Sequence, residues 1–158
     1  MKTLILYASK NGGAREIARR VANKISGPVT VRDLKKSDIP SIAQYDCVVI
    51  GSAIYFGAIR KEAKAFLAQN ADALKTKRLG LFLSGMNAAE EQKVFEAGFS
   101  AGMLKTASAK AFLGCVYDPK KASAIERFVI KNVTKQAGYN DTTDDAAIAQ
   151  FADALQEN

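Results

Sequence analysis

Five short apolar runs recur along the chain, and segments with helical periodicity separate them. The runs cover residues 3–7, 29–34, 47–52, 79–84 and 111–117. Several of them are continuously apolar rather than alternating, which indicates strands buried on both faces, as in a parallel sheet. We therefore predict five parallel strands.

Between these runs, apolar residues recur at the i, i+3, i+4 and i+7 spacing of one helix face. Four such stripes run through residues 14–25, 63–74, 95–103 and 148–155. Strands that alternate with helices of this length form right-handed crossover units. The pattern predicts an α/β fold over residues 1–158: one domain with a doubly wound five-stranded parallel sheet of order 2-1-3-4-5.

One segment, residues 118–138, is additional to this alternation of strands and helices and contains a further helical pattern. Its apolar positions are Ile125, Phe128, Val129 and Val133, and its other face carries Arg127, Lys131 and Lys135 after Lys120 and Lys121. The plainer interpretation is a solvated extra helix before the last one. The alternative is a basic amphipathic helix over residues 120–135 that meets an anionic membrane or an acidic partner.

The composition narrows the chemistry that this chain can perform. The 158 residues contain no histidine and no tryptophan, and 23 Lys and Arg face 16 Asp and Glu, a net charge of +7. The lack of histidine excludes a His general base, a Ser-His-Asp triad and a histidine-rich zinc site. Neither a membrane span nor a signal peptide is expected. Cys47 and Cys115 lie in apolar runs, so we expect core thiols in a cytoplasmic protein rather than a disulfide or metal pair.

The loops after the first, third and fourth predicted strands converge on one ligand in such a sheet. The first loop combines a hydroxyl, an amide and two glycines just before a helix, whose backbone N–H groups and dipole suit a phosphate monoester. It lacks the dinucleotide-binding and Walker A glycine patterns. Its residues are Ser9, Lys10, Asn11, Gly12, Gly13 and Ala14.

The other two loops contain aromatic side chains and hydrogen-bond donors that could bind a planar ring. The second places two aromatics beside a glycine, and stacking on aromatics holds a heterocycle; its residues are Ser52, Ala53, Ile54, Tyr55, Phe56 and Gly57. The third is small and rich in donors for the polar edge of a ring; its residues are Ser84, Gly85, Met86 and Asn87. Each loop could also be an ordinary strand-to-helix connection. Together they favour flavin mononucleotide (FMN), a cofactor that carries its own redox chemistry.

With these loops in place, the chain resembles the flavodoxin-like family, and within it the branch of flavodoxin-type protoporphyrinogen oxidases. The stretches MKTLILYASKNGGAREIA, YDCVVIGSAIYFGAIRKEAKAFL and IERFVIKNVTKQAG carry the resemblance. It implies that Ser9, Asn11, Gly12 and Gly13 hold the FMN phosphate, and that the second and third loops flank the isoalloxazine. Flavodoxins usually close the first loop with a threonine, where this chain has Ala14. One hydroxyl bond to the phosphate, of about 1.5–3 kcal/mol, is thereby lost.

Several functions remain open at this point. The first is an FMN-dependent oxidoreductase that oxidises a small-molecule substrate and reduces a quinone, at the inner membrane surface or free in the cytoplasm. The second is a simple flavodoxin that carries electrons between redox partner proteins, and the third is a cofactor-free flavodoxin-fold interaction protein. No catalytic side chain, metal or nucleic-acid partner is expected. A signalling receiver domain is disfavoured, because Ala8, Ser9 and Gly51 stand where acidic residues are required.

Overall fold

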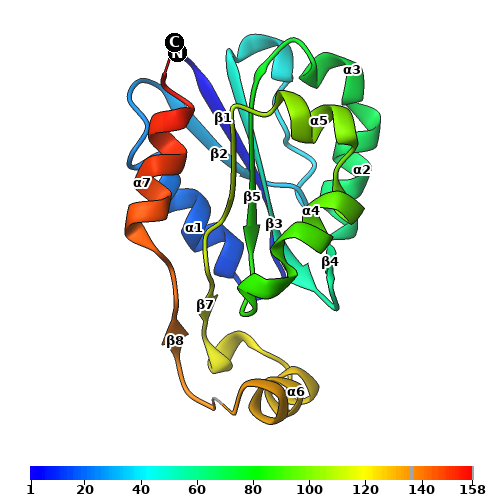
Figure 1. Cartoon of the computed structure of the whole chain (residues 1–158), viewed down its shortest axis with the longest axis vertical. Coiled ribbons are helices and arrows are strands. Elements are labelled where there is room, and N and C mark those ends of the chain that lie inside the picture. Colours follow the sequence, from blue (N-terminus) through cyan, green and yellow to red (C-terminus); the bar gives the residue numbers. More distant parts are fainter. Residues whose placement is uncertain (136, 158) are drawn as a thin grey trace.

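The computed structural model describes residues 1–135 and 137–157, and its centre is a parallel sheet (Figure 1). The parallel strands are β1 (Thr3–Ala8), β2 (Val29–Asp33), β3 (Cys47–Tyr55), β5 (Arg78–Ser84) and β6 (Ala109–Phe112). They lie in the order β2-β1-β3-β5-β6, which confirms the predicted order 2-1-3-4-5. In this register Thr3 lies between Val29 of β2 and Cys47 of β3.

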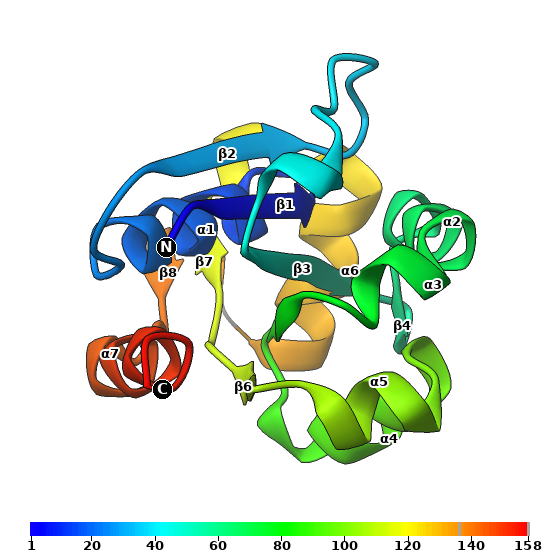
Figure 2. The same cartoon turned by 90° about the horizontal axis from the view of Figure 1, so that it is seen from above.

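Helices cover both faces of the sheet, as Figure 2 shows from above. The helices α1 (Gly13–Ala22) and α7 (Asp145–Ala154) lie on one face. The helices α2 (Lys61–Gln69), α3 (Ala71–Leu74), α4 (Glu91–Gly98) and α5 (Ala101–Thr106) lie on the other. Short 3₁₀ turns cover Ile42–Gln44, Ala88–Glu90 and Pro119–Lys121. Two apolar layers result, and the buried strands contribute to both.

The packing of the layers is close where β3 and β5 run side by side. A Cβ added to Gly51 would lie 1.9 Å from the ring of Phe82, which is itself fully buried. Only a glycine lets these two strands pack in this way, since interiors leave no void for an extra methyl group. The core therefore fixes the ends of β3 and β5, from which two of the three predicted loops start.

The predicted strand 111–117 is wrong as one element. The chain leaves the sheet at Phe112, and Gly114 follows with a φ of +79°. A Cβ on Gly114 would lie 2.2 Å from the carbonyl oxygen of Thr142, so two backbone segments pass each other there. The apolar residues beyond it form a separate strand, β7 (Val116–Tyr117), which pairs antiparallel with β8 (Asn140–Asp141).

The apolar stripe 95–103 is likewise two helices rather than one. Helix α4 ends at Gly98, and the Ser100 hydroxyl accepts a hydrogen bond from the Met103 N–H at 3.3 Å to cap α5. Periodicity alone does not show this break, because Phe95 and Phe99 still pack together with ring centroids 5.6 Å apart. The stripe 63–74 is interrupted in the same manner at Asn70, between α2 and α3.

The extra segment forms an appendage below the carboxyl ends of the strands (Figure 1). The β7–β8 ribbon leads to and from α6 (Ala124–Thr134), which confirms a helix within the basic segment. A capping box starts α6: the Ser123 hydroxyl accepts from the Glu126 N–H, and the Glu126 carboxylate accepts from the Ser123 N–H. Arg20 of α1 donates to Asp141 at 2.7 Å and holds the ribbon. Among the described residues, none belongs to a helix with the length and hydropathy of a bilayer span.

Candidate cofactor site

The first predicted loop makes a sharp turn between β1 and α1. Gly12 has a φ of +89° and precedes the first helical residue, Gly13. The Ser9 hydroxyl accepts from the Gly12 N–H at 2.9 Å, which fixes the turn. A Cβ on Gly13 would lie 2.8 Å from the Val116 carbonyl oxygen, so both glycines are required by shape.

The start of α1 provides backbone donors at this loop. The first intrahelical hydrogen bond runs from the Glu16 N–H to the Gly12 carbonyl at 3.1 Å. The N–H groups before it, from Gly13 to Arg15, have no intrahelical acceptor, and the helix dipole adds to their positive potential. Ala14 is fully buried in the apolar layer that α1 covers.

An ion pair joins this loop to α6. Lys10 Nζ lies 2.6 Å from Glu126 Oε1, and the Asn11 side-chain amide donates to the same oxygen at 3.4 Å. Burial alone would raise the pKa of Glu126, but the hydrogen bonds from Lys10, Ser123 and Asn11 lower it to about 2. Glu126 is therefore a carboxylate at neutral pH and lies beside the predicted phosphate loop.

The second predicted loop is mostly a β-hairpin, because β3 extends through Tyr55 and pairs with β4 (Ala58–Ile59). Only Phe56 and Gly57 form the turn, and their φ values of +48° and +70° are both positive, as in a type I′ turn. A bulky residue at positive φ is strained. Phe56 is also 83% exposed, so the strained turn presents an aromatic ring to the outside.

Other residues of this hairpin face inward or connect it to the first loop. The Ser52 hydroxyl is buried and accepts from the Arg60 N–H at 2.9 Å, so it supports the hairpin from within. The Tyr55 hydroxyl accepts from Lys10 Nζ at 3.0 Å, and the Tyr55 ring lies edge-on to Phe56 with centroids 4.6 Å apart. Tyr55 thus joins the first two loops.

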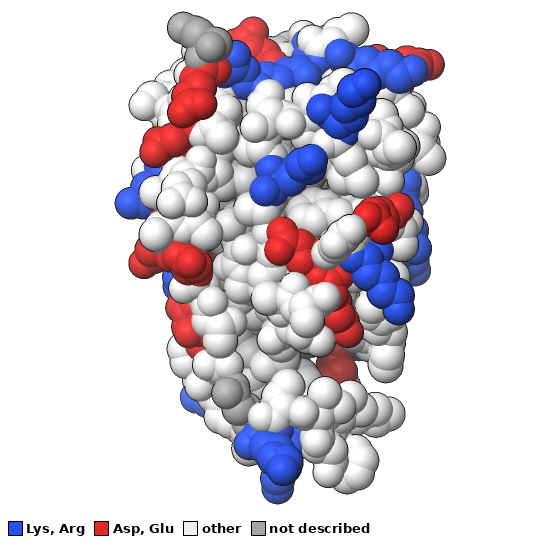
Figure 3. Space-filling view, in the orientation of Figure 1, with Lys and Arg blue, Asp and Glu red and all other residues white. Residues whose placement is uncertain are grey.

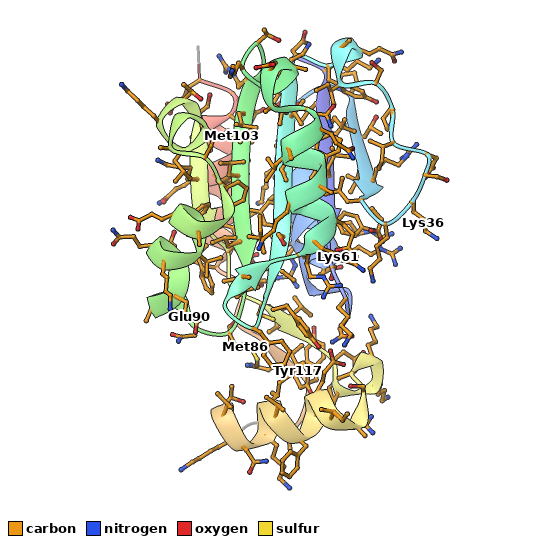
Figure 4. The ribbon with its side chains drawn as sticks, turned by 90° about the vertical axis from the view of Figure 1, so that its right-hand side faces the viewer. Lys36, Lys61, Met86, Glu90, Met103 and Tyr117 are labelled. Atoms are coloured by element: carbon orange, nitrogen blue, oxygen red, sulfur yellow. The ribbon has the colours of Figure 1, made fainter. Side chains whose placement is uncertain are left out.

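The third predicted loop contacts the second through small residues. A Cβ at the buried Gly85 would lie 3.0 Å from Ile54 Cδ1. Beyond it, Met86 is exposed, and the Asn87 side chain caps the next turn by accepting from the Ala89 N–H at 3.1 Å. Figure 4 places Met86 at the lower end of the sheet layers, above α6.

Cys115 lies between the third loop and the first loop. It is half-buried after Gly114 rather than in a core strand, whereas Cys47 is fully buried; both are free thiols. Burial raises the pKa of Cys115 to about 11, although a hydrogen bond with Ser84 opposes this shift. Its Sγ would lie 3.8 Å from a Cβ on Gly13. The three predicted loops are therefore contiguous at one edge of the sheet.

A polar cleft of about 550 Å³ opens on the β2 side of the first loop. Four residues of the first loop line it, with basic side chains from α1 and from the appendage, among them Arg15, Arg19 and Lys121. The Lys121 ammonium would lie 3.9 Å from a Cβ on Gly12, so its charge lies over the first loop. The second and third loops do not line this cleft.

Three residues near the predicted loops were not singled out as site residues from the sequence: Lys121, Glu126 and Cys115. They come from the segment after β6, more than 100 positions from the first loop. The capping-box pattern of Ser123 and Glu126 predicts a helix start. It does not predict that the same carboxylate pairs with Lys10, because that contact depends on how the appendage folds back.

Comparisons with known proteins agree with this architecture. The family model for the flavodoxin domain matches residues 4–144. The chain is 25% identical over 153 residues to protoporphyrinogen IX dehydrogenase [quinone] of Escherichia coli (strain K12), covering 87% of this chain and 81% of that protein.

Solved structures show the same fold. Oxidised flavodoxin 2 from Bacillus cereus superimposes with a TM-score of 0.64 at 20% identity, covering 99% of this chain and 98% of that one. Oxidised flavodoxin 1 from the same organism gives 0.60 at 16% identity, with coverage of 99% and 97%. Because the family model spans most of the chain and the strand order agrees, the chain belongs to the flavodoxin-domain family.

Proposed function

We propose that this chain binds FMN where β1, β3 and β5 end and acts as a flavoprotein oxidoreductase. The observation that carries the proposal is the convergence of three loops of different chemistry at one edge of the sheet. Backbone donors at the start of α1 face the first loop, and the Phe56 ring is exposed on the second. A phosphate joined to a planar ring matches both features.

The residues present fit such a group in shape and charge. Gly12 and Gly13 carry no side chains, the first loop contains the Lys10 ammonium, and the Lys121 ammonium lies close to Gly12. We propose that Ser9, Lys10, Asn11, Gly12, Gly13 and Ala14 hold the phosphate, chiefly through backbone N–H groups. The residues Ser52 to Gly57 and Ser84 to Asn87 would then enclose the ring.

When bound, FMN supplies the electron-transfer chemistry. The chain's own contribution is to bind, orient and cover it. The exposed Phe56 ring offers a stacking surface. Apart from its chain neighbours, no atom lies within 4 Å of where a Cβ on Gly57 would be, so the Gly57 peptide has room to reorient. The basic side chains around the first loop favour the negative charge that a reduced flavin carries.

For the electron acceptor we propose a quinone or another small molecule. Support comes from the likeness to protoporphyrinogen IX dehydrogenase [quinone] and from the basic appendage, through which the protein would contact an anionic membrane as a cytoplasmic, peripheral protein. The second candidate is a simple electron carrier between redox partner proteins. The fold shared with flavodoxins favours it, since such a carrier needs only an exposed flavin edge.

A visible spectrum of the purified protein tests cofactor binding. We expect a yellow protein that releases FMN on heating, or a colourless one that takes up added FMN and quenches its fluorescence. Failure to take up FMN would contradict the proposal. Anaerobic turnover with protoporphyrinogen IX and menaquinone then separates the two candidates, because a simple carrier would show no such turnover.

A further inference from the structure

Helix α6 presents an apolar stripe to the outside of the molecule. Ile125, Phe128 and Val133 are 76%, 70% and 76% exposed, and Val129 is 39% exposed. These four residues follow the i, i+3, i+4 and i+8 spacing of one helix face. Large apolar side chains in such a row, on a helix with no buried residue, indicate a surface that contacts something else.

Polar contacts at its first turn connect α6 to the rest of the molecule. Glu126 pairs with Lys10 and Asn11, and its side chain is only 11% exposed. The other half-buried positions, Ile130 and Thr134, follow Glu126 at i+4 and i+8. The side of α6 that faces the rest of the molecule is therefore a different side from the apolar stripe.

 The charges around the stripe are mainly positive. Residues 119–135 contain five basic side chains against one acidic side chain, Glu126, which is paired with Lys10; the basic ones are Lys120, Lys121, Arg127, Lys131 and Lys135. Arg127, Lys131 and Lys135 follow i, i+4 and i+8 spacing along one border of the stripe. An apolar face bordered by lysine and arginine is typical of helices that lie in the headgroup region of an anionic bilayer.

The stripe also lies at the functional end of the molecule. Figure 1 shows α6 below the carboxyl ends of the strands, and Figure 3 shows a mainly uncharged surface there with basic side chains at its lower edge. The exposed Phe56 and Met86 come from the loops at this same end of the sheet. A membrane that contacts α6 would therefore be close to the proposed cofactor site.

We propose that the apolar stripe of α6 inserts into the headgroup region of an anionic membrane. Lys131 and Lys135, which border the stripe, contact the lipid phosphates beside it. This inference rests on the proposed function and extends it. The stripe is the surface through which the protein would approach a quinone dissolved in the membrane. A second copy of the chain fits less well, because a symmetric contact along α6 would bring the basic borders of two stripes together.

Vesicle sedimentation with the whole 158-residue chain tests the proposal. The probes are vesicles of phosphatidylcholine alone and of phosphatidylcholine mixed with phosphatidylglycerol. We expect the wild type to sediment with the anionic vesicles, and less so as the salt concentration rises. The double variant Phe128→Ser/Val133→Ser should lower the partition coefficient about tenfold or more. The variant Lys131→Gln/Lys135→Gln should lower it about tenfold on anionic vesicles only.

Two further variants control for damage to the fold. Asn132 lies within the stripe, so Asn132→Leu should increase vesicle binding. Lys61→Gln/Lys105→Gln removes two exposed charges from α2 and α5 and should leave vesicle binding nearly unchanged. FMN uptake, read by fluorescence quenching, should be the same in all four variants. A protein that binds vesicles but takes up no FMN would contradict the proposed function and leave the membrane surface standing.

Other occupants of the stripe give different results. Absence of vesicle binding by the wild type, with a dimer in sedimentation velocity that Phe128→Ser/Val133→Ser dissociates, would assign the stripe to a second copy and overturn the proposal. Absence of vesicle binding together with loss of FMN uptake in that variant would show that the stripe covers the cofactor. Equal vesicle binding by the wild type and Phe128→Ser/Val133→Ser would also overturn it.

Discussion

The Lys10 ammonium lies 2.6 Å from the Glu126 carboxylate, so an ion pair connects the first loop after β1 to the first turn of α6. Lys10 also donates to the Tyr55 hydroxyl at 3.0 Å. One side chain thus contacts the hairpin and the appendage from within the proposed phosphate loop. The Glu126 carboxylate and a bound phosphate would both attract this ammonium, which couples α6 to cofactor binding.

Removing the charge of Glu126 should strengthen FMN binding. In Glu126→Gln, an anion beside the phosphate loop is lost and Lys10 is released to the cofactor, so we expect the Kd for FMN to fall about fivefold, as for ~1 kcal/mol. Fluorescence quenching of FMN measures this. Glu96→Gln, on the exposed side of α4, is the matched control and should leave the Kd unchanged. Weaker binding by Glu126→Gln would mean that Glu126 positions Lys10 for the phosphate instead.

The same ion pair predicts how stability depends on pH. The pKa of Glu126 is lowered to about 2 in the folded protein, below the usual value of 4.5. A lowered carboxyl pKa stabilises the fold above the unfolded-state value and loses this effect as the pH falls. Between pH 6 and about 3, the wild type should lose ~1–2 kcal/mol more free energy of unfolding than Glu126→Gln. Urea unfolding at several pH values measures the difference, and parallel pH profiles for both proteins would contradict it.

Restoring a hydroxyl at position 14 should improve phosphate binding. Threonine and valine have nearly the same shape, so Ala14→Val controls for the added volume at this fully buried position. A hydroxyl bond to a charged phosphate contributes about 1.5–3 kcal/mol. We therefore expect Ala14→Thr to bind FMN about tenfold more tightly than Ala14→Val, measured by fluorescence titration. Equal Kd values would place the phosphate away from residue 14.

Phe56 is expected to lower the stability of the fold and to strengthen cofactor binding. Its φ of +48° is strained for a bulky residue but ordinary for asparagine in a type I′ turn. Phe56→Asn should therefore raise the free energy of unfolding by ~1 kcal/mol and weaken FMN binding about fivefold through the lost ring. Phe56→Tyr keeps the ring and should retain FMN. Thermal unfolding and FMN titration together measure both effects; unchanged FMN affinity in Phe56→Asn would remove Phe56 from the site.

The basic surroundings of the first loop should raise the midpoint potential of the bound flavin. Lys121 lies over this loop, and a nearby positive charge favours a reduced, anionic flavin. Lys121→Gln should lower the midpoint potential by some tens of millivolts, and Lys105→Gln, near the end of α5, should not. Potentiometric titration of the FMN-loaded proteins measures both. A strongly negative potential in the wild type, unchanged by Lys121→Gln, would contradict the prediction.

The sequence predicts the sheet well because burial on both faces leaves a continuous apolar run. The runs 3–7, 29–34, 47–52 and 79–84 all correspond to strands: β1, β3 and β5 are one to three residues longer than their runs, and β2 is one residue shorter. Prediction fails at 111–117, where apolar residues continue past Gly114 although the backbone turns away to let residue 142 pass. A local pattern does not contain this crossing, because its cause is a segment 28 residues further along the chain.

For the candidate site, too, local patterns predict the loops and do not predict contacts with distant segments. The three loops could be identified because strand ends converge in this fold, and the structure shows them in contact through Tyr55, Gly85 and Cys115. The positions of Glu126 and Lys121 could not be identified, since both depend on the path of the appendage. Nor did the helical spacing of Ile125 and Phe128 show which side of α6 faces the body, because an exposed apolar stripe and a buried one have the same periodicity.

The β7–β8 ribbon brings the two ends of the appendage side by side, with Val116 opposite Asp141 and Tyr117 opposite Asn140. The segment between the two strands is therefore joined to the rest of the chain at two neighbouring residues, Tyr117 and Asn140. Such a segment can be lengthened, exchanged or replaced by a two-residue turn with no change in the order of the parallel strands. The appendage is therefore modular, and a common electron-transfer domain could acquire or lose its attachment to a surface by changes confined to this one insertion.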